Sequence, residues 1–445
     1  MNSVFHTIPC FRESCDGTYD CREGCTMLYY THVTQTDYNA YLKTLTADGF
    51  AVLQERTLDG NCFAALKKDV QVNCLFTPCD NTLRITASAV DQTPCFTETT
   101  CTGDCTTTFY GFENDQTLID CGMCLLVQCP DYSFFVVDSG HYFQFNDNDR
   151  IYKFMRERTP DGQKVVVNGW FITHGHSDHV SKLLDFLRYN TGDVVIEGFY
   201  QNLLPAEYPL GEDSNPEERA LAVKLFRELE AFPAPVYKLH SGMRFYIRNL
   251  CFDVLSTHED IYPEQITDYN DSSCVLMLHA EGSKVFIPGD AAVLASRVLE
   301  ARYAETLRCD VIQVAHHGHT GLSARCYELL CADTAVFPVT RIFYEEDIQR
   351  HEANRRILAL SAQQFVTGDG TVCIPLPYDR DTVYKLPDET FEDFAKIKRL
   401  WRYVYTDERQ KELYDLFLQN GGDAEKMLLP TSYKGFIEPK PPIEE

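Results

Sequence analysis

The sequence predicts an α/β protein with a small N-terminal α+β domain and a C-terminal helical tail. Three observations lead to this fold class. Apolar strand patterns alternate with amphipathic helical patterns between residues 122 and 338, which is typical of α/β domains. Cysteines crowd the front of the chain, where thirteen of the nineteen lie at or before Cys129. Charged helical stretches follow residue 379. We therefore expect domains over residues 1–112, 113–380 and 381–445.

The front of the chain predicts one short helix and four strands. The helix is expected over 38–46 and the strands over 50–56, 62–67, 70–76 and 82–87, separated by turn residues. The early cysteines Cys10, Cys15, Cys21 and Cys25 lack the regular spacing of a zinc ribbon or an iron–sulfur motif. A structural metal in this domain is therefore not the expectation.

The central part predicts a hairpin followed by alternating strands and helices. The hairpin is expected over 123–129 and 133–138. Further strands are expected over 165–173, 194–199, 236–240, 245–254, 274–278, 284–288, 311–315 and 334–338. Helices are expected over 180–189, 216–231, 291–301 and 323–331, and in the tail over 389–404 and 406–419.

Charge and hydropathy limit the classes of partner. The formal net charge is −26, from 66 acidic and 40 basic residues, and such a charge repels a polyanion. Nucleic acid is therefore an unlikely partner, although a local basic channel could override the total. The chain begins without a basic segment followed by an apolar run, and no apolar window approaches 18 residues. We expect a cytoplasmic protein with reduced thiols, no membrane contact and a small-molecule substrate; a homo-oligomer stays open.

Four metal-ligating side chains follow directly after the apolar strand pattern over 165–173. His174, His176, Asp178 and His179 lie within six positions, so a turn of the backbone must bring their side chains into one small volume. Neutral imidazole and carboxylate groups are usual ligands of zinc and similar divalent ions. The residue types and their spacing therefore predict a metal site rather than an exposed histidine-rich turn.

This run resembles the metallo-β-lactamase superfamily, whose hallmark His-x-His-x-Asp-His it matches letter for letter. The resemblance continues in order with Asp138 in Val-Val-Asp-Ser-Gly, with Pro288-Gly289-Asp290 and with Ala315-His316-His317-Gly318. The resemblance covers roughly residues 115–375. Within the superfamily, the sequence resembles especially a branch with Asn-x-x-Ser and His-His-Gly, which includes competence-type and phosphorylcholine-esterase-like hydrolases. The fold implied is the αββα sandwich of that superfamily.

The resemblance also implies roles for individual residues. His174 and His176 would hold a first ion, Asp178 and His179 a second, and Asp290 would bridge them. One of the paired histidines would complete the second site, and His317 is preferred to His316. His316 would lie beside the reacting centre as a proton donor or oxyanion partner, so that Asp178 and His316 are the expected catalytic residues. Asp138 would orient the histidine loop from behind.

The middle histidine of the family pattern is where this sequence departs. The corresponding position falls near Asn270, within Tyr269-Asn270-Asp271-Ser272-Ser273. His258 follows an apolar strand pattern in Thr257-His258-Glu259-Asp260, and a loop could bring it to the first ion. Whether His258 or Asn270 fills this position stays open; we count His258 among the candidate ligands.

The function implied is that of a dinuclear metal-dependent hydrolase. Two divalent ions, zinc ahead of manganese or iron, would hold a bridging water, lower its pKa to about 7 and direct it at a phosphoryl or carbonyl centre. A small-molecule phosphoester is the expected substrate. The alternatives are a metal-binding regulatory or binding module without turnover, and a hydrolase of a lactone, thioester or nucleic acid.

Overall fold

The computed structural model describes residues 3–22, 24–89, 93–116, 119–144, 146–206, 208, 210 and 216–387. Its first sheet is antiparallel, with strand order β1-β2-β6-β5-β4-β3. The strands are β1 (Gly17–Arg22), β2 (Cys25–Tyr30), β3 (Ala51–Leu58), β4 (Asn61–Lys67), β5 (Gln71–Thr77) and β6 (Thr82–Ser88). Helix α1 (Gln35–Ala47) covers one face and buries Tyr38, Leu42 and Leu45 against the strands.

Two further sheets make up the rest of the described fold. The second contains β7 (Thr108–Gly111), β8 (Cys124–Gln128), β9 (Phe134–Asp138), β10 (Val165–Ile172), β11 (Val194–Ile196), β12 (Phe199–Gln201), β13 (Val236–Lys238), β21 (Val372–Pro375) and β22 (Tyr384–Lys385). The third contains β14 (Arg244–Ile247), β15 (Leu250–Ser256), β16 (Val275–Ala280), β17 (Ser283–Ile287), β18 (Val311–Gln313), β19 (Thr334–Phe337) and β20 (Gln363–Val366).

The second and third sheets pack face to face around the largest core of the molecule. Phe135 and Phe171 of the second sheet lie in one buried cluster with Phe252, Leu276 and Ile287 of the third. The rings of Phe135 and Phe252 have centroids 4.4 Å apart, so the inner faces are in direct contact. Strands β9 and β10 run parallel, as do β17 and β18; their carboxyl ends therefore point to the same edge of each sheet.

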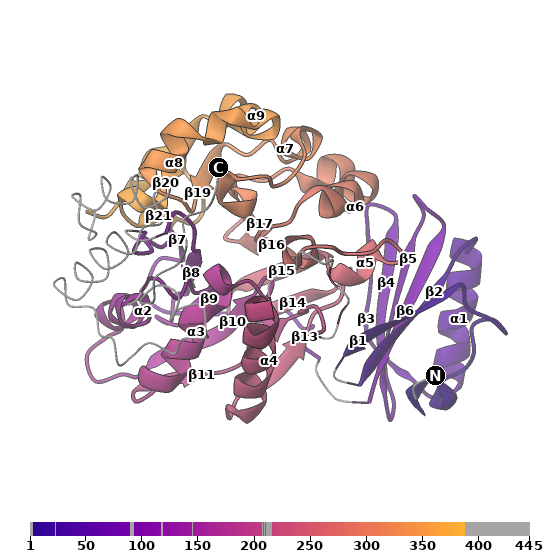
Figure 1. Ribbon diagram of the computed structural model, residues 1–445. Helices are drawn as coiled ribbons and strands as arrows, with labels where there is room; N and C mark the ends of the chain where they lie inside the picture. The colour runs from indigo at the N-terminus through magenta and orange to yellow at the C-terminus, as the bar shows by residue number, and fades with distance from the viewer. Residues whose placement is uncertain are drawn as a thin grey trace.

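Helices cover the two outer faces of this pair of sheets (Figure 1). On the second sheet these are α2 (Asp147–Glu157), α3 (Ser177–Tyr189) and α4 (Pro216–Ala231). On the third they are α6 (Val293–Tyr303), α7 (Ala324–Leu330), α8 (Arg341–Glu346) and α9 (Glu352–Leu360). Each helix faces its sheet with apolar residues, as an amphipathic surface helix does. The expected αββα sandwich is confirmed, with the first sheet and the short helix α5 (His258–Ile261) beside it.

The structure differs from the expected elements in several places. The strand expected over 245–254 is two antiparallel strands, β14 and β15, because the chain turns at Arg248 with a φ of 54°. Strand β7 pairs with β8 of the second sheet, although it lies before residue 113. The division at residues 112 and 380 stays a prediction. The helices expected over 389–404 and 406–419 lie outside the described residues.

Within the described part of the chain, no helix combines the length and apolarity that crossing a bilayer would need.

A buried carboxylate joins the first sheet to the sandwich. Asp253 in β15 accepts hydrogen bonds from Arg56 in β3 at 2.5 Å and from Arg244 in β14 at 2.7 Å. His279 lies 3.0 Å from the same carboxylate. Burial alone would raise the pKa of Asp253, but these three partners hold it well below its usual value. The charge of Asp253 therefore stabilises the contact between the two parts.

We predict that Asp253→Asn lowers the free energy of unfolding by about 2–3 kcal/mol at pH 7, the range for hydrogen bonds to charged groups. Because the pKa of Asp253 is lowered in the native state, its charge stabilises the fold fully at pH values above the unfolded pKa of about 3.9. This stabilisation is lost as the pH falls further. Urea unfolding should therefore show the difference shrinking below about pH 4.

Asp48→Asn is the matched control, because Asp48 pairs with Lys68 at 3.1 Å while both side chains are at least 40 % exposed. It should cost less than about 1 kcal/mol. If the loss in the free energy of unfolding for Asp253→Asn grows toward low pH, or is no larger than the loss for the control, the role assigned to Asp253 is contradicted.

Candidate metal centre

Four strand ends meet at one edge of the sandwich and carry the candidate ligands. Strand β9 ends at Asp138, and the neighbouring strand β10 leads into His174. Strand β17 of the third sheet leads into Asp290, and β18 leads into His317. The backbone N–H of Cys274 donates to the carbonyl of Thr173 at 2.9 Å, which holds the two sheets together at this edge.

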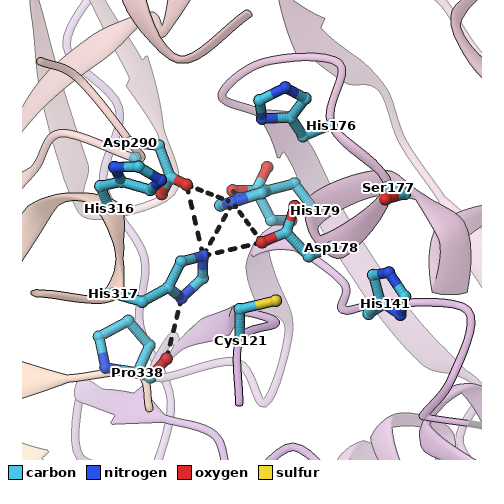
Figure 2. A network of polar contacts seen from close by, with 12 residues as sticks. Cys121, His141, His176, Ser177, Asp178, His179, Asp290, His316, His317 and Pro338 are labelled. Atoms are coloured by element: carbon cyan, nitrogen blue, oxygen red, sulfur yellow. Dashed lines mark hydrogen bonds and ion pairs between the residues drawn. The ribbon is translucent and has the colours of Figure 1, made fainter. Parts of the chain in front are cut away.

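Four side chains bring one ligand atom each to a common point (Figure 2). Asp178, His179, Asp290 and His317 place these atoms within 4.8 Å of one another. The Nε2 atoms of the two histidines are 3.2 Å apart. Their distances to the Oδ2 atoms of Asp178 and Asp290 are 3.0, 3.1, 3.4 and 3.7 Å. A tetrahedral ion with ligands at about 2.0–2.1 Å has ligand–ligand edges of roughly 3.3 Å, so the group has the size of a divalent metal site.

The outer nitrogens of both histidines are held by acceptors. Nδ1 of His317 lies 2.9 Å from the carbonyl oxygen of Pro338, which can only accept, so Nδ1 carries a proton. Nδ1 of His179 lies 2.7 Å from a carboxylate oxygen of Asp138, the partner that metal-ligating histidines commonly have. Asp138 also accepts from the backbone N–H and the hydroxyl of Thr173, at 2.9 and 2.7 Å. Both Nε2 atoms therefore point at the two carboxylates.

The carboxylates of this group favour a positive charge between them. Asp290 is 1 % exposed, and burial alone would raise its pKa; the charges of His179 and His317 instead hold that pKa well below its usual value. Burial lowers the pKa of His317, but Asp290 and Asp178 together raise it to about 10. Without a metal, the two carboxylates would thus keep the histidines protonated. The group is built to neutralise positive charge at its centre.

His174 and His176 lie next to this group. Nε2 of His174 is 3.1 Å from Nδ1 of His176 and 4.0 Å from Oδ2 of Asp290. The other carboxylate oxygen of Asp290, Oδ1, is buried without a hydrogen-bond partner. An unpartnered buried oxygen is costly, and a second ion beside His174 would satisfy it. His174, His176 and Asp290 are the donors nearest this second point, but they do not bring their ligand atoms within 4.8 Å of one another as the first group does.

Unusual backbone conformations position these ligands. Asp138, His316 and His317 have φ values of 54°, 51° and 53°. Non-glycine residues held in this region cost of order 1–3 kcal/mol each, and their clustering here is typical of functional sites. Gly289 has a φ of 57°, and a Cβ there would lie 2.7 Å from the Cβ of Thr173. Only glycine therefore lets the loop that carries Asp290 approach the histidine loop.

His316 lies beside Asp290 in Figure 2 but is not one of the four converging ligands. Its Nδ1 faces the carbonyl of Thr320 at 3.0 Å and must carry a proton. Its Nε2 accepts from the side-chain amide of Asn270 at 3.2 Å. The remaining amide oxygen of Asn270 is buried without a hydrogen-bond partner. Asn270 therefore reaches the edge of the site, through the short turn Tyr269–Ser272.

His258 was counted among the candidate ligands, and the structure gives both its ring nitrogens other partners. Nδ1 lies 2.8 Å from the hydroxyl of Tyr19 in the first sheet, and Nε2 lies 2.9 Å from the amide oxygen of Asn202. The strand before it ends one residue short of Thr257, and α5 begins at His258 itself. The ring therefore turns toward the first sheet, so we do not retain His258 as a ligand.

Two residues near the site carry no signal that identifies them in the sequence. Glu218 of α4 accepts hydrogen bonds from the backbone N–H and the hydroxyl of Ser177, at 2.9 and 2.8 Å, and so fixes the start of α3, which carries Asp178. His141 lies across Asp178 from His317 in Figure 2. Its Nδ1 accepts from the backbone N–H of Phe143 at 3.0 Å, and burial lowers its pKa to about 3. His141 is therefore neutral. In the sequence, only its position three residues after Asp138 could have suggested that it lies near the site.

No protein-family model and no curated protein matches the chain. The chain is similar to several solved structures. A metallo-β-lactamase fold protein, YhfI from Bacillus subtilis, is 11% identical, with 58% of this chain and 95% of that chain covered and a TM-score of 0.33. Zn²⁺-bound PqqB from Methylobacterium extorquens is 14% identical, with 57% and 88% covered and a TM-score of 0.34. Unliganded yeast PDE1 is 10% identical, with 59% and 98% covered and a TM-score of 0.34. Because these identities and scores are low, the description of the site rests on its own residues.

Proposed function

We propose that the protein is a metal-dependent hydrolase that binds two divalent ions and acts on a small-molecule phosphoester. The observation that carries the proposal is the convergence of Asp178, His179, Asp290 and His317 at the spacing of a tetrahedral ion. Zinc suits the imidazole and carboxylate donors, and manganese or iron would accept the same set.

The ligands divide between two ions around Asp290. Asp178, His179 and His317 would hold one ion, and His174 with His176 would hold the other, with Asp290 shared between them. Bound divalent ions lower the pKa of a water molecule and polarise the phosphoryl group that it attacks. No side-chain nucleophile is then required.

Residues outside the ligand set would orient the substrate and move a proton. Nε2 of His316 is a neutral acceptor beside Asp290, 3.2 Å from the Asn270 amide. It would take a proton at that atom and return it to the leaving group. The unpartnered amide oxygen of Asn270 would accept a hydrogen bond from the substrate. Asp138 would hold His179 in the tautomer that leaves Nε2 free.

The charges around the site favour a small substrate over a nucleic acid. Asp268 lies 3.9 Å from His176, and Glu218 is hydrogen-bonded to Ser177. In α3, the basic side chain nearer the site along the helix, Lys182, is paired with Asp185. A nucleic-acid partner would need a row of Lys and Arg contacts to phosphates. The choice of a phosphoester follows the resemblance of Asn270-x-x-Ser273 and His316-His317-Gly318.

We predict that Asp290→Asn removes both metal binding and turnover. The wild-type protein should hold two ions per chain after dialysis and hydrolyse bis-p-nitrophenyl phosphate. The variant should hold fewer ions and lose at least about 100-fold in kcat/KM, because even partners behind the ligands affect metal sites by 10–100-fold. Elemental analysis and the phosphodiester assay measure the two effects.

Asp193→Asn is the control, because it makes the same chemical change on a side chain that is 46 % exposed and contacts Tyr152 and Arg156. It should leave both readouts unchanged. If the protein binds two ions but hydrolyses none of a panel of phosphoesters, lactones and thioesters, it is a metal-binding module without turnover and not a hydrolase. A wild-type protein that holds no ion would overturn the metal site itself.

We predict that Asp138→Asn weakens metal binding by about 10–100-fold, because it loosens the partner of His179 without removing a ligand. Excess metal should restore kcat to within a few-fold of wild type. A metal titration monitored by activity separates the two quantities. Asp131→Asn, which alters an ion pair with Arg248 at 2.7 Å, is the control. Unchanged metal affinity, or activity that excess metal does not restore, would contradict the positioning role.

A further inference from the structure

Two thiols and a histidine–carboxylate pair lie buried between the first sheet and the sandwich. Cys21 and Cys25 lie on the neighbouring strands β1 and β2 and are 0 % and 1 % exposed. His240 follows β13, and Glu259 lies in α5; these side chains are 5 % and 3 % exposed. None of the four takes part in the metal centre described above.

These side chains form one chain of contacts. The register of β1 and β2 shifts between Asp20 and Arg22, and Cys21 at this bulge lies in one buried cluster with Cys25 of the neighbouring strand. Besides Cys21, the His240 side chain lowers the pKa of the Cys25 thiol. Nδ1 of His240 lies 2.8 and 3.0 Å from the two carboxylate oxygens of Glu259. The order of groups is therefore thiol, thiol, imidazole, carboxylate.

The charges in this chain favour a thiolate at Cys25. The hydrogen bond from Cys21 lowers the pKa of Cys25, and the hydrogen bond and charge of His240 lower it further against the effect of burial. Burial would lower the pKa of His240, but Glu259 raises it to about 10. Burial raises the pKa of Cys21, which stays a thiol. A thiolate, not a thiol, is the nucleophile in sulfur chemistry.

A metal is a poorer explanation for this chain of contacts. Among the described residues, the group around Asp290 is the one set of three or more histidine, cysteine or acidic side chains whose ligand atoms lie within 4.8 Å of one another. Cys21, Cys25 and His240 do not meet at a common point in this way. What the structure does provide is two neighbouring thiols in one buried cluster and a buried His240–Glu259 pair whose histidine lowers the pKa of Cys25.

We propose that Cys21 and Cys25 are a redox couple, which a hydroperoxide converts to an intramolecular disulfide by way of the Cys25 thiolate. In the first step the Cys25 sulfur attacks the peroxide, an S–O bond forms, the O–O bond breaks, and the alcohol or water leaves with a proton. In the second step Cys21 attacks the Cys25 sulfenic acid, an S–S bond forms, the S–O bond breaks, and water leaves. The two thiols together lose two protons and two electrons, which reduce the O–O bond.

The full-length protein tests this without any substitution. Hydrogen peroxide is added, remaining thiols are alkylated with N-ethylmaleimide, and the protein is digested with trypsin without reductant. Cleavage after Arg22 separates the peptide with Cys21 from the peptide with Cys25, and fragment-ion sequencing of the linked pair distinguishes Cys21 from Cys15, which lies in the same peptide. The internal control is Cys74, which is also buried in the first sheet but has its pKa raised by burial.

The Cys21–Cys25 linkage should form at least about tenfold faster than Cys74 is oxidised, because thiolate character sets the rate. Equal rates for Cys74, or a linkage of Cys21 or Cys25 to other cysteines, would overturn the proposal. Cys21→Ser should trap a Cys25 sulfenic acid that reacts with dimedone. His240→Gln should slow the wild-type linkage about tenfold, whereas His32→Gln, at an exposed position, should not. A dimedone-negative Cys21→Ser protein that remains folded by circular dichroism would contradict Cys25 as the attacking thiolate.

Discussion

Two carboxylates buried together at the edge of the sandwich impose the main constraint on this structure. Asp290 is 1 % exposed and Asp178 14 %, so water solvates these negative charges poorly, and they lie within 3.0–3.7 Å of the Nε2 atoms of His179 and His317. Burying charges costs several kcal/mol per ion unless they are compensated. The four strand ends, the sharp backbone turns and the hydrogen bonds behind the histidines all serve to place a positive charge among these carboxylates.

Different sheets supply the residues that surround the two carboxylates. The second sheet supplies Asp138 and the histidine loop, and the third supplies Asp290 and His317. The contact between Phe135 and Phe252 fixes the distance between these sheets. The first sheet supplies none of the converging ligands, yet it meets the sandwich through Asp253 and through the chain of contacts that ends at Glu259. The candidate metal centre and the thiol pair therefore lie in separate parts of one scaffold.

The sequence alone predicted that the candidate ligands close together in the chain gather at one place. His174, His176, Asp178 and His179 follow one strand within six residues, so local spacing was enough to place them together. The prediction of Asp290 and His317 depended on a family pattern. These two residues are 27 positions apart, and no local signal relates either of them to the first group. The choice of His258 failed for a physical reason: Tyr19, 239 positions away, holds its ring elsewhere. The strand pattern over 245–254 hid the turn at Arg248 for a different reason: the segments on both sides of the turn are apolar and read as one strand. His240, Glu259 and the two thiols belong to segments that only tertiary packing brings together.

Anomalous diffraction from crystals grown with zinc tests the central claim most directly. We predict one anomalous peak bounded by Asp178, His179, Asp290 and His317, and a second beside His174 and His176 on the other side of Asp290. A single peak among the first four residues would reduce the centre to one ion. No peak at this edge of the sandwich, with these side chains ordered and the protein saturated with zinc, would contradict the account.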